Sequence, residues 1–244
     1  MPQSAGVDCG KFLNYRRSVG LEILYKDKNL IAVYKPSGLP SQSDTTGDED
    51  ALTLASRELI LLGENKELWL VHRLDRVVGG ILVFARNKKY AALLSSLVSD
   101  RGIKKEYLAV VDGEAEGGVL RDYLYKDSAK GKAFVVDSQR KGVKEAELEY
   151  ERLFRIEADK GVKTLVRIDL HTGRFHQIRV QFSSRGTPIS GDGKYGSRDS
   201  VAKTPALFAY RLSFTADGKD YQFTKLPCAS EYPWSLFDFD ILGE

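Results

Sequence analysis

Cysteine is scarce in this chain, with only Cys9 and Cys228 among 244 residues. Two cysteines cannot build the set of disulfides that stabilises many small secreted proteins, and they lack the paired spacing of a thiolate metal site. We therefore expect both thiols to be reduced and to take no part in the function.

Long apolar runs are also missing. No stretch has the roughly 20 consecutive apolar residues that a membrane-spanning helix needs. The N-terminal segment contains Arg16 and Arg17 but has no apolar core before a small-residue cleavage site, so it is not a secretory signal. These absences predict a cytoplasmic protein that does not enter a membrane.

Several motifs of common enzyme classes are absent. The chain has no G-x-S-x-G elbow, no G-x-G-x-x-G turn and no Walker A loop, which leaves serine hydrolysis and nucleotide cofactors unsupported. The three histidines, His72, His171 and His176, show neither the H-E-x-x-H spacing nor the cysteine pairs of a zinc site. We expect no metal and no cofactor.

Charge of one sign is not in large excess, because 37 basic and 34 acidic residues give a net charge of +3. The basic residues nevertheless cluster in RLDR, RNKK, RGIKKEY, TGRFHQIR and KYGSR. Such clusters suit a phosphate backbone if they surround one cleft, and are otherwise solvated faces of a globule. Charge alone does not decide between these alternatives.

The pattern of apolar residues predicts an α+β protein. β-Branched runs and turn residues predict strands at 21–26, 30–35, 69–71, 81–86 and 106–114, then β structure from 117 to 170 with 146–157 and 162–170 as antiparallel partners. Helices are expected at 48–62, 87–102 and 172–186. Irregular alternation with few helices favours a mixed, mostly antiparallel sheet with flanking helices rather than a parallel βαβ array.

The last of these helices carries several polar residues of interest. Phe175, Ile178 and Phe182 share one helical face, which we expect to be buried. His176, Arg179 and Ser183 point more nearly the opposite way, and Gly186 ends the helix.

The polar residues most suited to chemistry lie in HRLDRVVGG, in KKEYLAVV and in HTGRFHQIR. Each has an ordinary structural explanation when taken singly. Asp75 is explained equally well as a turn residue, Tyr107 as a strand residue with a solvated hydroxyl, and Arg179 as the partner of a surface carboxylate.

The order of the motifs is more informative. KPSGLP, HRLDRVVGGILVFAR, KEYLAVV and HTGRFHQIRV followed by GTPISGDGKYG together resemble the catalytic domain of the RluA family of RNA pseudouridine synthases, over about residues 21–223. The resemblance implies a central RNA-binding cleft with Asp75 as the catalytic aspartate, Tyr107 against the target base and Arg179 paired with Asp75.

This chain departs from the family pattern at two places. Val78-Gly79-Gly80 replaces the usual Thr-Ser-Gly, which removes two hydroxyls from the catalytic loop, so backbone groups or water must replace their hydrogen bonds. Gln181 replaces a second histidine after HQIRV. The first departure favours the main alternative function, a noncatalytic RNA-binding or RNA-folding protein that keeps a synthase-like cleft; metal-dependent RNA hydrolysis is a more remote alternative.

The domain organisation follows from the same comparison. We expect a flexible arm at 1–20 and one catalytic domain at 21–244, because about twenty residues are too few for a separate RNA-binding domain of the S4 type. RNA, either rRNA or tRNA, is the expected partner, and the protein is expected to be a monomer. We predict RNA contacts from His72, Arg73, Arg76, Lys104, Lys105, Arg174 and His176.

The chemistry explains why these residue types suit the reaction. A carboxylate can attack covalently or remove a proton from the ribose, and both roles are open to Asp75. A carboxylate in a partly dry pocket is driven towards protonation unless a cation is near, and Arg179 is the expected compensating charge.

Overall fold

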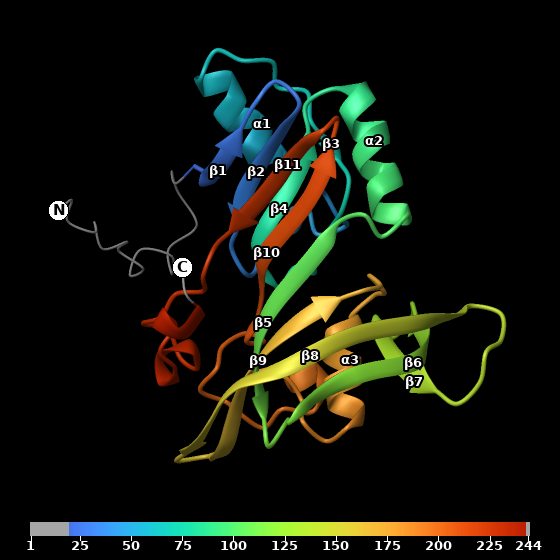
Figure 1. The fold of residues 1–244 in the computed structure, drawn as a ribbon, viewed down its shortest axis with the longest axis vertical. Coiled ribbons are helices and arrows are strands. Elements are labelled where there is room, and N and C mark those ends of the chain that lie inside the picture. Colours follow the sequence, from blue (N-terminus) through green and yellow to red (C-terminus); the bar gives the residue numbers. More distant parts are fainter. Residues whose placement is uncertain (1–19, 243–244) are drawn as a thin grey trace.

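The computed structural model describes residues 20–242. In this part of the chain, 11 strands form one sheet in the order β1-β2-β4-β10-β5-β9-β8-β6-β7, with β11 paired to β10 and β3 paired to β4 (Figure 1). All pairings are antiparallel except that of β4 with β10. The prediction of a mixed, mostly antiparallel sheet is confirmed.

The elements have the following bounds. The strands are β1 (Ile23–Lys26), β2 (Leu30–Lys35), β3 (Trp69–Leu70), β4 (Gly79–Ala85), β5 (Lys104–Asp112), β6 (Gly117–Asp127), β7 (Lys132–Val136), β8 (Val143–Ala158), β9 (Gly161–Leu170), β10 (Leu207–Ala216) and β11 (Lys219–Thr224). The helices are α1 (Ala51–Leu61), α2 (Lys88–Ser99) and α3 (Gln177–Ser184), with 3-10 turns η2 (Gly193–Tyr195), η3 (Trp234–Leu236) and η4 (Asp240–Leu242).

The first half of the sheet is covered on both faces. Side chains alternate across a strand, so Ile31 and Val33 of β2 pack with α1, whereas Leu30 and Ala32 pack with α2. Every residue of β4 is buried between these two layers. Asp50 caps α1 by accepting the Thr53 N–H at 3.0 Å, as the acidic residues before this helix predict.

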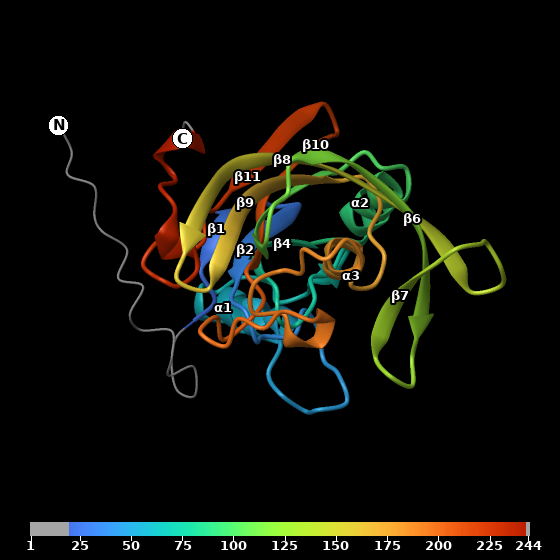
Figure 2. The ribbon, with the colours of Figure 1, turned by 90° about the horizontal axis from the view of Figure 1, so that it is seen from below.

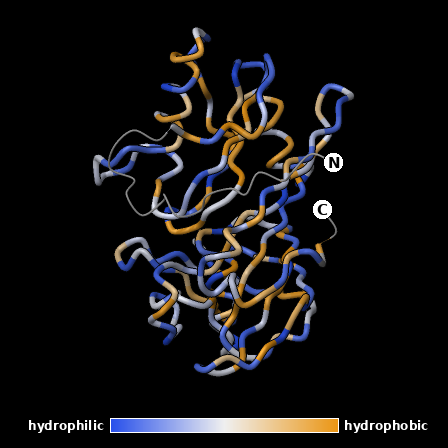
Figure 3. Tube along the Cα trace, turned by 90° about the vertical axis from the view of Figure 1, so that its left-hand side faces the viewer, coloured by the Kyte–Doolittle hydropathy of each residue, from blue (hydrophilic) through white to orange (hydrophobic). Residues whose placement is uncertain are grey.

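The second half is a curved antiparallel sheet of β5, β9, β8, β6 and β7 that wraps around α3 (Figure 2). The long strands β8 and β9 pair as predicted from the sequence. Figure 3 shows hydrophobic stretches alternating with hydrophilic ones along the chain, as expected for strands and helices with one buried face. Strand β5 runs through both halves and places residues at their junction.

Two local predictions are wrong. The strand predicted at 81–86 begins earlier, because Gly79 and Gly80 already belong to β4, where they pair with β10. A Cβ at Gly80 would lie 2.3 Å from the Ala209 carbonyl oxygen, so this close parallel pairing requires glycine. The predicted helix at 172–186 begins only at Gln177, because His176 adopts a left-handed conformation with φ of 54°. Gly186 ends it, as expected.

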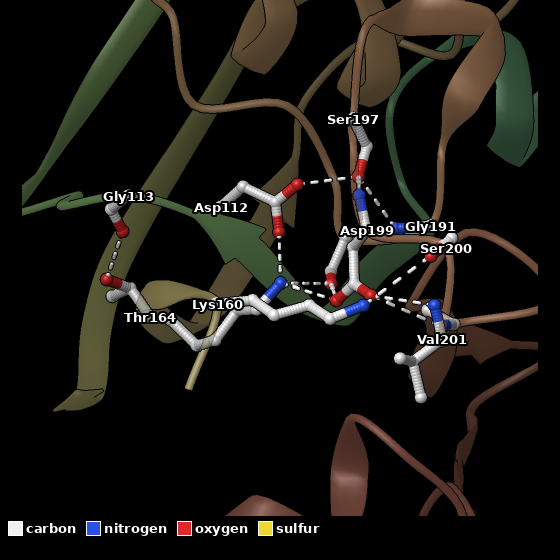
Figure 4. A network of polar contacts seen from close by, with 12 residues as sticks. Asp112, Gly113, Lys160, Thr164, Gly191, Ser197, Asp199, Ser200 and Val201 are labelled. Carbon is white, nitrogen blue, oxygen red and sulfur yellow. Dashed lines mark hydrogen bonds and ion pairs between the residues drawn. The ribbon is translucent and has the colours of Figure 1, made fainter. Parts of the chain in front are cut away.

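A buried polar network joins the ends of β5 and β9 to the loop that follows α3 (Figure 4). Lys163 donates to Asp112 at 2.5 Å, to Asp199 at 2.5 Å and to the Ser190 hydroxyl at 2.9 Å. Ser197 donates to the other oxygen of Asp112 at 2.6 Å. The 190–201 loop is therefore held firmly against the sheet.

Some expectations concern the chain as a whole. The predicted arm at 1–20, which contains Cys9, lies outside the described residues except for Gly20. Cys228 is disulfide-bonded, so the expectation of a reduced thiol is wrong at this position. Within residues 20–242 no helix is both long and apolar enough to cross a membrane. In the same residues no group of three His, Cys, Asp or Glu side chains is arranged to hold a metal ion.

Candidate active site

A cleft of about 620 Å³ lies at the junction of the two halves. It is lined by the 71–78 loop, the C-terminal end of α2, strand β5 and the 170–179 segment. These segments are far apart in the sequence. The cleft brings together all of the predicted site residues except Arg76 and Lys104.

The loop that carries Asp75 is held in place through its backbone. The Ser41 hydroxyl accepts the Leu74 N–H at 3.0 Å and donates to the Leu74 carbonyl at 2.9 Å. Ser37 donates to the Val77 carbonyl at 2.7 Å, and the Val78 N–H donates to the Asp75 carbonyl at 3.0 Å. Hydroxyls of the KPSGLPS segment thus fix the backbone of the loop on both sides of Asp75.

Lys35 is a buried member of the same support, and the sequence analysis assigned it no role. Its Nζ donates to the carbonyls of Pro36 at 3.0 Å, Leu39 at 2.7 Å and Arg76 at 3.3 Å. Burial lowers the pKa of Lys35 to about 7, against the opposing effect of the Asp75 charge. The ammonium therefore joins the two loops beneath Asp75 and contributes positive charge when protonated.

Asp75 itself is partly buried and incompletely paired. Its Oδ2 lies 3.5 Å from Nη1 of Arg179 and 3.7 Å from Nε2 of His176. Burial raises the pKa of Asp75, and the charges of Arg179, Arg73 and Lys35 counteract this rise only in part. The pairing of Asp75 with Arg179 that the resemblance implied is therefore present as a long ion pair.

Arg179 makes its shorter bonds elsewhere. Its Nε donates to Oδ2 of Asp192 at 2.6 Å and its Nη2 to Oδ1 at 2.8 Å, a bidentate pair with both side chains buried. The expectation that Arg179 lies on the less buried face of its helix is wrong, because residues 177–182 are all buried. Sequence reasoning missed Asp192, although it stands in the quoted stretch GTPISGDGKYG.

Tyr107 enters the cleft from β5, where all but a small part of its surface is buried. Burial, followed by the negative charge of Asp75, raises the pKa of Tyr107 above its ordinary value. The phenol is therefore protonated at neutral pH. Its ring offers an apolar face to a planar ligand close to the carboxylate.

The two histidines of the cleft have different surroundings. His72 accepts the Val83 N–H on Nε2 at 3.1 Å, which makes it a structural brace between the loop and β4. His176 has its Nδ1 2.9 Å from the Tyr195 hydroxyl and is stacked on Phe175. Burial lowers the pKa of each to about 3, and nearby cations add to the effect, so both imidazoles are neutral.

The predicted phosphate-binding residues separate into two groups. Arg73, Lys105 and Arg174 line the cleft. Arg76 instead binds Asp48 and donates to the Gly38 carbonyl at 3.0 Å, which tethers the exposed 42–49 loop. Lys104 pairs with Glu106 at 3.1 Å and Asp169 at 3.5 Å. Arg76 and Lys104 lie outside the cleft because local carboxylates hold them.

Comparison with known proteins identifies the family to which the chain belongs. The model of the family described as RNA pseudouridylate synthase matches residues 29–184, which include Asp75, Tyr107 and Arg179. The chain belongs to this RNA pseudouridylate synthase family. The resemblance to the RluA family that the motifs indicated is confirmed.

Individual relatives agree. An uncharacterized RNA pseudouridine synthase of Aquifex aeolicus is 34% identical over 212 residues, which are 81% of this chain and 66% of that protein. The tRNA pseudouridine synthase C of Pasteurella multocida is 32% identical over 91% of this chain and 98% of its own length. The structure of human RNA pseudouridylate synthase domain containing 4 has a TM-score of 0.70 and 26% identity, covering 85% of this chain and 89% of that one. The α+β fold of the family is thereby confirmed.

The second departure from the family pattern lies away from the site. Gln181 is fully buried and faces β6, where its Nε2 donates to the Leu120 carbonyl at 3.2 Å and to Asp122 at 2.7 Å. It does not line the cleft. The replacement of a histidine at this position therefore affects the packing between α3 and β6 and not the lining of the cleft.

Proposed function

We propose that this protein is an RNA pseudouridine synthase that isomerises specific uridines in folded rRNA or tRNA, with Asp75 as the catalytic residue. The observation that carries the proposal is the position of Asp75 in the cleft, with Arg179 at 3.5 Å and with Tyr107 in the same lining. Membership of the synthase family supports it.

The reaction moves one base without a net change of oxidation state. The N1–C1′ bond breaks, the uracil turns while it stays bound, C5 forms a bond to C1′, and the C5 proton is lost while N1 gains a proton. No electron acceptor and no group donor is required by this balance. A carboxylate, a cation that supports it and a pocket that retains the free base are sufficient.

Asp75 can act in either of two ways. As a nucleophile it attacks C1′, and the covalent bond breaks again when C5 attacks; as a base it removes a ribose proton that is later returned. Both ways need the ionised carboxylate. Partial burial makes that carboxylate more basic than one in water, and Arg179 keeps it charged and oriented.

The target base must leave its stack before it can reach Asp75. Extruding a stacked base costs a few kcal/mol, and stacking on an aromatic side chain contributes about 1–3 kcal/mol per base. The ring of Tyr107 can therefore offset much of the cost and lets the uracil turn in its plane. A cleft of about 620 Å³ is within the range of small-ligand pockets and can hold one nucleotide.

RNA binding around the cleft is assigned to Arg73, Lys105 and Arg174, with neutral His176 beside Asp75. Phosphate contacts by such side chains position the RNA but do not specify its sequence. The Pasteurella relative carries a tRNA enzyme's name, which supports tRNA as one class of target. The cytoplasmic location and the monomeric state remain predictions.

A tritium-release assay on RNA labelled at uridine C5 tests the function. We expect the parent protein to release tritium and form pseudouridine, and Asp75→Asn to do neither. Asp137→Asn, a change of an exposed aspartate outside the cleft, is the control and retains activity. Binding of RNA without release would support the noncatalytic alternative, and chain cleavage would support hydrolysis.

Arg179 offers a second test of the same site. Equal turnover by Arg179→Ala and the parent enzyme would remove the support that the ion pair lends to the mechanism. Mapping pseudouridines in a deletion strain, and again after complementation with the parent gene or Asp75→Asn, would identify the uridine that is modified.

A further inference from the structure

Three lysines from separate elements lie at the cleft or against residues beside it. Lys126 of β6 lies with its Nζ 4.6 Å from the ring centre of Phe175, and it also lines the cleft. Lys132 of β7 has its Nζ 5.0 Å from the ring centre of Tyr195. Lys194 of η2 reaches the turn between β6 and β7, where its Nζ lies 3.5 Å from the position of a Cβ on Gly131.

The hairpin that carries two of these lysines is fixed to the catalytic half of the molecule. Leu124 and Ala133 pack in one small core with Val180 of α3 and with Tyr195. The Tyr195 hydroxyl accepts the Ala133 N–H at 2.8 Å and contacts His176 at 2.9 Å. In Figure 2 the hairpin of β6 and β7 stands out from the body of the molecule. Its charges therefore have a defined position relative to Asp75.

These lysines differ from most of the arginines of this half. Most arginines here are neutralised by carboxylates, in the pairs Arg121–Glu147, Arg152–Glu116, Arg155–Glu114, Arg167–Glu151 and Arg185–Asp122. Within residues 20–242, Lys126, Lys132 and Lys194 form no ion pair with a carboxylate. Lys126 and Lys194 are exposed and Lys132 is half-buried. Because no carboxylate neutralises these ammonium groups, an anion that approaches them is attracted by each of them.

The field of this cluster reaches the catalytic centre. Lys194 and Lys126 join burial and Arg179 in lowering the pKa of His176, which lies 3.7 Å from Asp75. An anion bound at the cluster therefore lies close to a nucleotide in the cleft. Each phosphate of an RNA strand carries one negative charge, so a strand that passes beside the cleft can contact several of these lysines.

On the basis of the proposed function, we propose that Lys126, Lys132 and Lys194 form a track that binds the phosphates of the RNA strand next to the flipped uridine. Compact ammonium groups contact phosphates as point charges. The track therefore contributes affinity and sets the direction in which the strand leaves the cleft, and it does not select the base sequence.

The test compares two triple variants of the full chain with equal loss of charge. The first is Lys126→Gln, Lys132→Gln and Lys194→Gln. The control is Lys28→Gln, Lys66→Gln and Lys88→Gln, three exposed lysines that form no ion pair in the described residues and do not line the cleft. Binding of a fluorescein-labelled oligouridylate is measured across a range of KCl concentrations, and thermal unfolding checks the fold.

For the first variant we expect the slope of log K against log salt to become shallower by about 2, because each lost phosphate contact on a single strand removes about 0.7. We expect binding to weaken roughly tenfold or more at physiological salt. The KM for tritium release from labelled RNA should rise. The corresponding triple change to arginine should restore the slope, and the control should match the parent.

Equal slopes for the first variant and the control would overturn the proposal, and so would weaker binding with an unchanged slope. An acidic protein partner as the true ligand would give the first of these results. The binding slope is measured without turnover. Absence of tritium release by the parent would therefore refute the proposed function, whereas the slope still decides the phosphate track.

Discussion

Asp75 and Asp199 each face a buried cation, but the two carboxylates are paired to very different degrees. Asp199 belongs to the polar network of Figure 4. It accepts hydrogen bonds from Lys163 at 2.5 Å, Ser190 at 2.9 Å and Tyr232 at 2.7 Å, and its side chain is 2% exposed. Asp75 has a contact of 3.5 Å with Arg179, whose shorter bonds go to Asp192, and its side chain is 20% exposed.

The pKa values follow this difference. Burial acts to raise the pKa of Asp199, but its bonds from Lys163, Tyr232 and Ser190 outweigh burial and hold the pKa below the ordinary range. Burial of Asp75 is not fully offset, and its pKa is raised. A carboxylate whose acceptors are all satisfied is stabilising and unreactive, whereas one left partly unsatisfied is available for chemistry.

Exchanging each carboxylate for its amide is the strongest test of this contrast. Asp75→Asn should lower turnover by about 10³-fold or more, because it removes the nucleophile or base. Its melting temperature should not fall. Since the raised pKa means that ionised Asp75 destabilises the fold above the unfolded-state pKa, a modest rise is expected. Tritium release and thermal unfolding measure the two effects; a folded, fully active Asp75→Asn protein would refute the catalytic assignment.

Arg179, which contacts both Asp75 and Asp192, should be the position where substitution causes the next largest loss of activity. Arg179→Lys keeps the charge but loses the planar fork that binds Asp192 through two bonds. A small displacement of a catalytic support can cost about 10²-fold in rate, and we expect a loss of that order in kcat/KM. Lys163→Arg in the structural network is the control, with turnover per folded molecule retained. Comparable kinetic losses in both variants would abolish the distinction.

Asp199→Asn should affect stability rather than chemistry. Removing one partner of a buried ion pair costs about 3 kcal/mol of unfolding free energy, since Lys163 is left with Asp112 alone. Because the folded pKa of Asp199 is lowered, its contribution is present above the unfolded-state pKa and is lost as the pH falls through the folded pKa. Urea unfolding of parent and variant at several pH values measures this, and the two curves should converge in acid.

Two substitutions of Tyr107 should distinguish base stacking from chemistry of the hydroxyl, with a smaller loss of activity than the changes above. Tyr107→Leu removes base stacking of about 1–3 kcal/mol and should reduce kcat/KM by roughly tenfold. Tyr107→Phe keeps the ring, so its loss should be only a few-fold. If single-turnover assays show that the two variants are equally impaired, the phenol rather than the ring is required.

The smallest effect expected is a shift in pH dependence. Activity needs ionised Asp75, and its pKa is raised, so kcat/KM should fall with decreasing pH at a higher pH than an exposed aspartate would give. Weakening the positive field by Arg73→Gln should move this acid limb further upward. An acid limb at or below the ordinary aspartate pKa in both proteins would contradict the partial compensation of Asp75.

Local sequence patterns predicted most elements but not their exact ends near the site. The helix that carries Arg179 starts later than its periodicity suggests. Gln177 accepts the Thr172 hydroxyl at 2.8 Å and the Arg174 N–H at 3.0 Å, which turns the preceding segment back before the helix begins. These bonds involve a side chain, so the spacing of apolar residues contains no signal for them.

The sequence by itself determined the α+β class and the family, and it singled out Asp75, Tyr107 and Arg179 as candidate site residues, because short motifs and apolar alternation are local properties of the chain. The tertiary structure alone decided which partners these residues have. In the folded protein Arg179 pairs with Asp192, and Lys35 lies beneath the loop that carries Asp75. Arg76 and Lys104 pair with carboxylates outside the cleft, whereas Lys126, Lys132 and Lys194 lie beside it. Such pairings depend on contacts between distant segments, and burial and charge compensation are set only when those segments meet.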